Sequence, residues 1–233
     1  MASFLVLWDV DYTLVNTRGV GLHLYQLAFS ELYGRELPPT AGEANMAGRT
    51  DRAIALDVLA LAEIPDPRGQ VRAFEKTLAR LAPSLAGLVA ASAHALPGAA
   101  AVLAAMAGTV GRQSLLTGNV RALAEVKLAP LGLTRHLDLE VGAYGDEHEV
   151  RAELVHLARS RAAAAYGADF AGQATVLVGD TPLDIEAALV TGARAVGVAS
   201  GQYSQQQLSE AGADAVLPDL TDTGAVLTAV LGG

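Results

Sequence analysis

Short, largely apolar runs that end at polar or turn-forming residues mark the strands that this chain is predicted to form. They occupy residues 4–8, 113–116 and 175–178, with shorter runs at 196–198 and 215–217. Runs of this length with such boundaries are typical of strands buried in a sheet. From residue 98 onward they alternate with helical segments, which predicts an α/β fold with a central parallel sheet.

The stretch from residue 19 to about residue 93 differs, because its apolar positions recur at helical spacing almost throughout. Helices are predicted over residues 21–33, 51–62 and 68–91, the last interrupted near Pro83. No convincing buried strand is found there. A helical block between the first strand and the rest of a parallel sheet indicates an inserted all-helical domain.

Two carboxylates separated by one residue, Asp9 and Asp11, follow the first predicted strand directly. Open parallel sheets place their active sites at the carboxyl ends of strands. Acids this close raise each other's proton affinity unless a cation neutralises them. The pair therefore indicates either a bound metal ion or a carboxyl group that keeps its proton at neutral pH.

A second acidic pair follows the strand at 175–178. Asp180 stands at the strand end, and Thr181 with a following proline is typical of a helix start, which places Asp184 in the first helical turn. Neighbouring strands would bring these acids toward Asp9, and an oxygen-rich site of this kind suits Mg²⁺. Asp184 alone is equally explained by the helix macrodipole.

A third junction between strand and helix lies at Thr117, Gly118 and Asn119. Thr117 offers a hydroxyl, Gly118 allows close approach of the backbone, and Asn119 is placed to cap the following helix. Free N–H groups at such a helix start bind phosphate well. On its own this segment is an ordinary turn and cap, but together with the two acidic junctions it predicts a phosphate site.

In this order, the three motifs resemble those of the haloacid dehalogenase superfamily, whose phosphohydrolases form an aspartyl phosphate. Residues 9–13 are similar to its first motif, Thr117 to its second, and residues 179–184 to its fourth. The resemblance covers the whole chain and extends to the phosphoglycolate phosphatase and beta-phosphoglucomutase-like group. It implies a Rossmann-like three-layer core of residues 1–16 and 95–233 and a helical cap of residues 17–94.

The resemblance also assigns roles to individual residues. Asp9 is implied as the nucleophile and Asp11 as the general acid and base, and haloacid dehalogenases proper lack the second of these acids. The implied cofactor is Mg²⁺. The residues expected to contact the metal or the phosphate are Asp9, Asp11, Asp180, Asp184 and the Val10 carbonyl for the metal, and Thr117, Gly118, Asn119 and Arg151 for the phosphate.

Two departures from the family pattern stand out. Tyr12 stands where many relatives have glycine, and the lysine of the third motif is not evident, since the only lysines are Lys76 and Lys127. Lys127 lies eight residues beyond Asn119 on the predicted helix, about 12 Å from its start at ~1.5 Å rise per residue, so we expect it to point away from the site.

Arg151 is expected to supply the missing cation. It follows a strand predicted at residues 137–141 and a polar loop at 145–149, and it opens the next helix. Its planar fork can clamp a phosphate or a carboxylate. In the predicted cap, residues 47–51 offer one candidate for substrate specificity, Arg49. The alternative is that Thr50 or Asp51 simply caps a helix beside an exposed arginine.

Composition narrows the classes of function. A hydrophobic content of 52% with 18% charged residues predicts a folded protein, and the formal net charge of -9 argues against nucleic acid or an anionic membrane as a partner. The absence of cysteine excludes disulfides, a thiol nucleophile and cysteine-ligated zinc. The first apolar run stops at Asp9, so no signal peptide is expected and a cytoplasmic location is predicted.

The sequence thus predicts a Mg²⁺-dependent phosphatase acting on a small phosphorylated metabolite. Phosphoglycolate, a sugar phosphate and a nucleoside monophosphate all fit. A phosphomutase would use the same residues but return the phosphoryl group to a bound sugar. A signalling receiver domain also stores an aspartyl phosphate, but that interpretation does not explain the helical insertion. The oligomeric state is not indicated.

Overall fold

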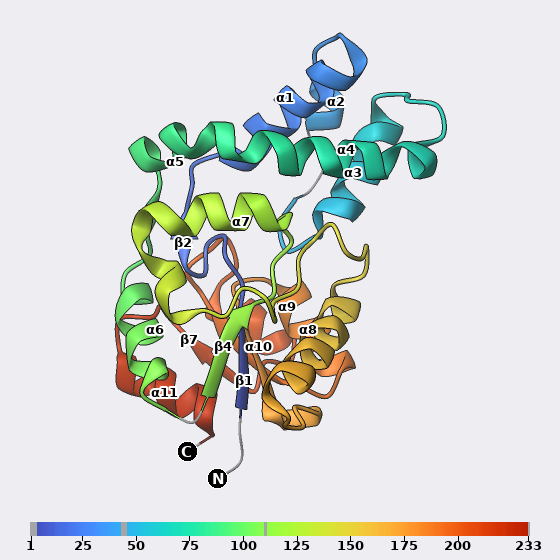
Figure 1. Cartoon of the computed structure of the whole chain (residues 1–233). Coiled ribbons are helices and arrows are strands. Elements are labelled where there is room, and N and C mark those ends of the chain that lie inside the picture. The colour runs from blue at the N-terminus through green and yellow to red at the C-terminus, as the bar shows by residue number, and fades with distance from the viewer. Residues whose placement is uncertain (1–3, 43–45, 110, 233) are drawn as a thin grey trace.

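The computed structural model describes residues 4–42, 46–109 and 111–232. Its centre is a five-stranded parallel sheet in the order β4-β1-β5-β6-β7 (Figure 1). The strands span, in sheet order, Gly111–Leu115, Phe4–Trp8, Thr175–Gly179, Arg194–Val198 and Ala215–Leu217. The predicted α/β class is therefore confirmed. β1 lies between β4 and β5, so the ends of these three strands meet.

Alternate residues of the strands pack into two different hydrophobic clusters. Val6 and Trp8 of β1 face α6 and α11, whereas Leu5 and Leu7 face α8, α9 and α10. Both faces of the sheet are thus covered by helices, which gives three layers (Figure 1) and explains why the central strands β1 and β5 are largely apolar. These helices span Ala99–Ala107 (α6), Arg151–Tyr166 (α8), Pro182–Val190 (α9), Gln205–Glu210 (α10) and Thr223–Leu231 (α11).

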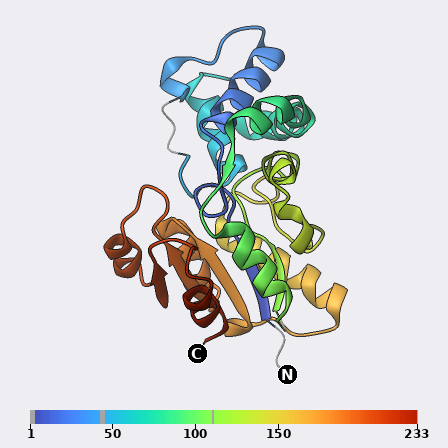
Figure 2. The same ribbon diagram turned by 90° about the vertical axis from the view of Figure 1, so that its left-hand side faces the viewer.

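The helices formed by residues 20–92 make up a separate group beyond the carboxyl ends of the strands (Figures 1 and 2). They share a hydrophobic cluster that includes Phe29, Val58 and Phe74. Val120 and Leu123, next to and on α7 (Arg121–Leu128), join the same cluster, so α7 packs beneath the inserted helices. The inserted helices span Val20–Tyr33 (α1), Pro39–Gly42 (α2), Asp51–Leu61 (α3), Pro67–Leu81 (α4), the 3-10 turn Ala82–Leu85 and Ala86–Ser92 (α5).

A short antiparallel ribbon stands where the chain leaves the sheet and returns to it. β2 (Val15–Asn16) pairs with β3 (His94–Ala95), with Val15 opposite Ala95. This ribbon lies next to the predicted limits of the two domains, although the domain division itself remains a prediction.

The strand predicted at residues 137–141 is wrong. The chain forms 3-10 turns at Ala129–Leu131 and Leu133–His136 and then crosses the edge of β4 with isolated hydrogen bonds, from Asp138 N to Gln113 O and in a bridge between Leu116 and Ala143. Leu137 and Val141 are buried without forming a strand, so their apolar character reflects burial and not membership of the sheet. Among the described residues, no helix is long and apolar enough to cross a membrane.

Candidate active site

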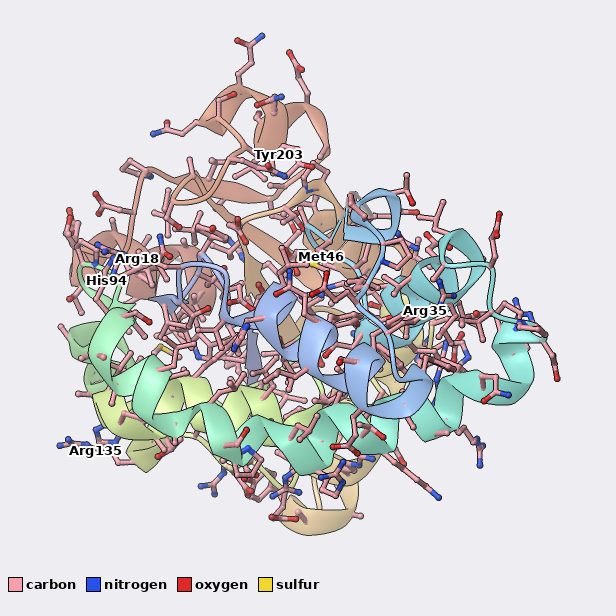
Figure 3. The ribbon with its side chains drawn as sticks, turned by 90° about the horizontal axis from the view of Figure 1, so that it is seen from above. Arg18, Arg35, Met46, His94, Arg135 and Tyr203 are labelled. Carbon is pink, nitrogen blue, oxygen red and sulfur yellow. The ribbon has the colours of Figure 1, made fainter. Side chains whose placement is uncertain are left out.

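The carboxyl ends of β1, β4 and β5 bring the sequence motifs together. Trp8 is in register with Leu115 on one side and Val178 on the other. Asp9, Thr117 and Asp180 therefore emerge at one edge of the sheet, where they line a cleft of about 520 Å³ beneath the inserted helices. Seen from above, Met46, which also lines the cleft, lies near the middle of the molecule (Figure 3).

Three buried carboxylates meet in this cleft. One oxygen from each of Asp9, Asp180 and Asp184 lies within 4.8 Å of the others. Burial raises the pKa of Asp9 to about 7, although the charge of Arg151 opposes the shift. Burial, followed by the charges of Asp9 and Asp184, raises the pKa of Asp180 to about 9. The cluster thus carries more negative charge than the protein neutralises, which suits a hard cation with oxygen ligands.

Asp184 has two tasks in this arrangement. Its Oδ2 accepts from the backbone N–H of Thr181, and the Thr181 hydroxyl accepts from the N–H of Asp184, so the two residues form a capping box at the start of α9. The predicted Thr181 cap is therefore confirmed. The other oxygen of Asp184 lies 2.5 Å from Arg151 Nη2, so the cap also holds Asp184 toward the cluster.

Arg151 is buried beside the nucleophile candidate. Its Nη2 lies 2.8 Å from Asp9 Oδ1 and also donates to the Leu116 carbonyl, and its Nη1 donates to the Gly48 carbonyl. Its Nε–H is buried and has no acceptor among the described residues. The first residue of α8 thus brings its guanidinium to Asp9, as the sequence position suggested.

Lys127 does not point away from the site, and that expectation is wrong. Its Nζ lies 2.8 and 2.6 Å from the two oxygens of Asp11 and 2.7 Å from Asn119 Oδ1. The error came from treating distance along a helix as distance from the site. α7 begins only at Arg121 and runs across the strand ends (Figure 1), and helical side chains lean toward the N-terminus, so a long lysine reaches back.

Asp11 stands apart from the acid cluster. Burial acts most strongly and would raise the pKa of Asp11, but the Lys127 charge and hydrogen bonds from Lys127, Asn119 and Thr17 together lower it below its ordinary value. Asn119 Nδ2 donates to Asp11 Oδ2 at 2.8 Å, and the Thr17 hydroxyl donates to Oδ1 at 3.3 Å. Asp11 is not among the three grouped acids, so the geometry does not favour it as a metal ligand.

Asn119 does not cap the helix, contrary to the expectation from sequence. Its side chain donates to Asp11 and to the Thr117 hydroxyl, whereas Val120 is the N-cap residue and has no side-chain cap bond. The Val120 N–H donates instead to Asp51 of the inserted helices, at 2.6 Å. Asn119 thus links the second motif to the first.

Asp51 was missed as a site residue, although it belongs to the segment that contains Arg49. Its buried carboxylate also accepts from the Tyr25 hydroxyl at 2.8 Å, and burial raises the pKa of Asp51 to about 6. Thr50 caps α3 as predicted. Arg49 lines the cleft, but its guanidinium lies 2.7 Å from Asp57 on α3. A substrate contact by Arg49 would have to compete with that ion pair.

Two glycines let the inserted helices press onto the core. The backbone N–H of Asp51 donates to the Gly118 carbonyl, and that of Arg52 donates to the Gly145 carbonyl. A Cβ on Gly118 would lie 2.0 Å from the Arg49 carbonyl, and one on Gly145 would lie 1.7 Å from the Gly118 carbonyl. Close backbone contact therefore requires glycine at both positions.

Tyr12 adopts a backbone conformation that glycine reaches without steric cost. Its φ is 55°, and its carbonyl accepts from the Ser200 hydroxyl. A left-handed conformation is unfavourable for a residue with a Cβ. The turn after Asp11 thus keeps a glycine-type conformation although the residue is tyrosine.

Comparisons with known proteins agree with this geometry. The model of the haloacid dehalogenase-like hydrolase family matches residues 6–189. The chain is 31% identical over 211 residues to the probable phosphatase IndB of Dickeya dadantii (strain 3937), an alignment that covers 89% of this chain and 86% of that protein.

Solved structures show the same fold. A hydrolase from Pseudomonas syringae aligns over 97% of both chains with 20% identity and a TM-score of 0.66. A haloacid dehalogenase-like hydrolase from Streptococcus pneumoniae covers 97% of this chain and 99% of its own, with 16% identity and a TM-score of 0.63. With the family match over most of its length, the chain belongs to the haloacid dehalogenase-like hydrolases.

Proposed function

We propose that this hydrolase is a Mg²⁺-dependent phosphatase that cleaves a small phosphomonoester through an aspartyl phosphate on Asp9. The observation that carries the proposal is the buried cluster of three acids at the strand ends. Asp9 belongs to the cluster and is held by Arg151 at the floor of the cleft. A buried carboxylate fixed in this way is a positioned nucleophile.

The acid cluster fits the metal. Asp9, Asp180 and Asp184 supply carboxylate oxygens close enough to share one ion, and the raised pKa values of Asp9 and Asp180 are those expected of acids that lack enough positive charge. When bound, Mg²⁺ would neutralise charge on the carboxylates and on the phosphoryl group. Asp11 is left out of this set because Lys127 and Asn119 hold it.

Asp9 and Asp11 both act in each of the two proposed steps. In the first, an Asp9 oxygen forms a bond to phosphorus while the bond to the leaving oxygen breaks, and Asp11 gives that oxygen a proton. In the second, Asp11 takes a proton from water, whose oxygen bonds to phosphorus as the bond between phosphorus and the Asp9 oxygen breaks, releasing inorganic phosphate and the free Asp9 carboxylate. Each step is easier than direct displacement by water.

We propose that Arg151 supplies positive charge for the phosphoryl oxygens, because its buried Nε–H has no acceptor among the described residues. Thr117 follows Leu116, whose carbonyl accepts from Arg151, just beyond the end of β4. The cleft volume of about 520 Å³ leaves room for a leaving group as well as the phosphoryl group. Residues of the insertion, among them Tyr25 on α1 and Met46 and Arg49 just before α3, would face that leaving group.

A screen of phosphorylated metabolites with and without Mg²⁺ tests this function. We expect inorganic phosphate to accumulate with at least one small phosphomonoester, only when Mg²⁺ is present, and not with Asp9→Asn protein. Consumption of a sugar phosphate without phosphate release would indicate a phosphomutase instead. Metal-independent hydrolysis would contradict the proposed site.

A further inference from the structure

The carboxylate of Asp11 is fully engaged by donors from its own chain. Lys127 donates to both oxygens, Asn119 to Oδ2, and Thr17 to Oδ1. An ionised carboxylate offers about four acceptor positions, so the weakest of these contacts must yield when Asp11 meets the leaving oxygen or water. The longest of these contacts, at 3.3 Å, is the one from Thr17. Lys127 and Asn119 therefore fix Asp11 in one orientation.

The ammonium group of Lys127 is equally engaged. Only 2% of the residue is exposed, and its three contacts go to Asp11 Oδ1, Asp11 Oδ2 and Asn119 Oδ1. A lysine ammonium has three donors. No donor thus remains for a phosphoryl oxygen unless one of these bonds breaks. A buried lysine with this arrangement is a clamp for Asp11 rather than a phosphate ligand.

Arg151 and Lys127, the buried cations among the described residues that line the cleft, therefore serve different acids. Among the described residues, Arg151 forms ion pairs with Asp9 and Asp184, whereas the ion pair of Lys127 is with Asp11. Asn119 connects the Lys127 pair to Thr117, since its amide donates to both Asp11 and the Thr117 hydroxyl. Removal of either cation should accordingly disturb a different part of the reaction.

We propose that Lys127 is a positioning residue that, with Asn119, holds Asp11 where it exchanges protons with the leaving oxygen and with water. This inference rests on the proposed phosphatase function. Lys127 then acts through Asp11 and not on the phosphoryl group. Its loss should matter most when the leaving group needs a proton, and least when the leaving group departs readily as an anion.

Phenyl phosphate and 4-nitrophenyl phosphate test this role, because they are similar in shape but differ in leaving-group quality. The value of kcat/KM reports steps up to departure of the first product. In Lys127→Met protein we expect kcat/KM for phenyl phosphate to fall on the order of 100-fold and that for 4-nitrophenyl phosphate by less than about threefold. Inhibition by inorganic phosphate should stay unchanged.

The exposed Lys76 on α4 provides the matched control. Lys76→Met should leave kcat/KM for both substrates and the thermal midpoint unchanged. Should Lys127→Met fail to fold, Lys127→Gln keeps a polar donor and should show the same difference between the substrates. Lys127→Arg restores the charge and should recover part of the phenyl phosphate activity.

Three results would overturn the role. Equal losses on both substrates with weaker phosphate inhibition would place Lys127 on the phosphoryl group. Kinetics like those of Lys76→Met would deny it any role in the reaction. Failure of the wild-type protein to hydrolyse either substrate or any other phosphomonoester with Mg²⁺ would overturn the phosphatase function itself, and this role with it.

Discussion

The two acids of the first motif, Asp9 and Asp11, have only one residue between them, but their surroundings are opposite. Asp9 faces Asp180 and Asp184 with one guanidinium between them, and its pKa is raised, with burial as the largest cause. Asp11 faces an ammonium and an amide, which lower its pKa against the effect of burial. The Asp9 side of the site therefore requires a further cation to neutralise its acids, whereas the Asp11 side does not.

The largest effect is expected from the side that requires the cation. Asp9→Asn should abolish turnover, because the amide is a poor nucleophile and also weakens the metal site. Phosphate release by purified, folded protein is the measurement. Glu186→Gln, an exposed acid on α9, is the control and should keep full activity. Near wild-type hydrolysis by Asp9→Asn would remove the proposed nucleophile.

Loss of the metal should also affect the Asp9 side. Asp180→Asn should weaken Mg²⁺ binding, so that EDTA-treated protein stays inactive at metal concentrations that restore the wild type. Asp184→Asn should have a smaller effect on Mg²⁺ affinity, whereas Asp11→Asn should leave it nearly unchanged. Calorimetric titration of the folded variants checks this order. Unchanged affinity in Asp180→Asn protein would contradict the assignment of the cluster.

The next largest effect is expected from Arg151, the cation on the Asp9 side. Arg151→Ala should lower kcat/KM by about 100-fold or more for every leaving group, because it removes charge from both Asp9 and the phosphoryl group. Arg151→Lys should recover activity only in part, since a point charge does not replace a planar fork. Circular dichroism checks folding, and Arg72→Ala on α4 is a surface control. A loss confined to substrates with poor leaving groups would contradict the separate roles of Arg151 and Lys127.

The two sides also differ in how well the sequence predicted them. The strand ends fixed the positions of Asp9, Asp180 and Arg151 because each acid or cation directly follows a strand or opens a helix. Lys127 was misjudged because its place depends on the direction of α7, which is set by packing of Val120 and Leu123 against the inserted helices. Periodicity along one helix does not contain that information.

The fold was likewise predicted correctly where apolar patterns decide the structure and wrongly where packing between distant segments does. Central strands and long helices were correct, because their apolar patterns match burial on one sheet or helix face. The segment at 137–141 failed because its buried residues pack against the edge of β4 without forming a ladder. Asp51 was not recognised as a site residue because its partners, Tyr25 and Val120, lie far from it in sequence.

The smallest expected effect concerns stability in the absence of metal. Asp9 and Asp180 have pKa values raised to about 7 and about 9. A raised pKa in the folded state means that the folded protein binds protons more tightly, so stability is greatest below the ordinary pKa and is lost as pH rises through the raised values. The thermal midpoint of metal-free protein should therefore fall by several degrees between about pH 5 and pH 9.

Mg²⁺ should reverse this trend, because binding requires the ionised acids, and its stabilising effect should grow with pH. The lowered pKa of Asp11 acts in the opposite sense, but only in acid, where its stabilisation is lost as pH falls through that value. Thermal melts across this range with EDTA or Mg²⁺ separate the two sides, with Asp180→Asn as the variant that should flatten the metal-free profile. A midpoint that rises with pH in EDTA would show that the acids at Asp9 are already neutralised by the protein, and the contrast between the two sides would then disappear.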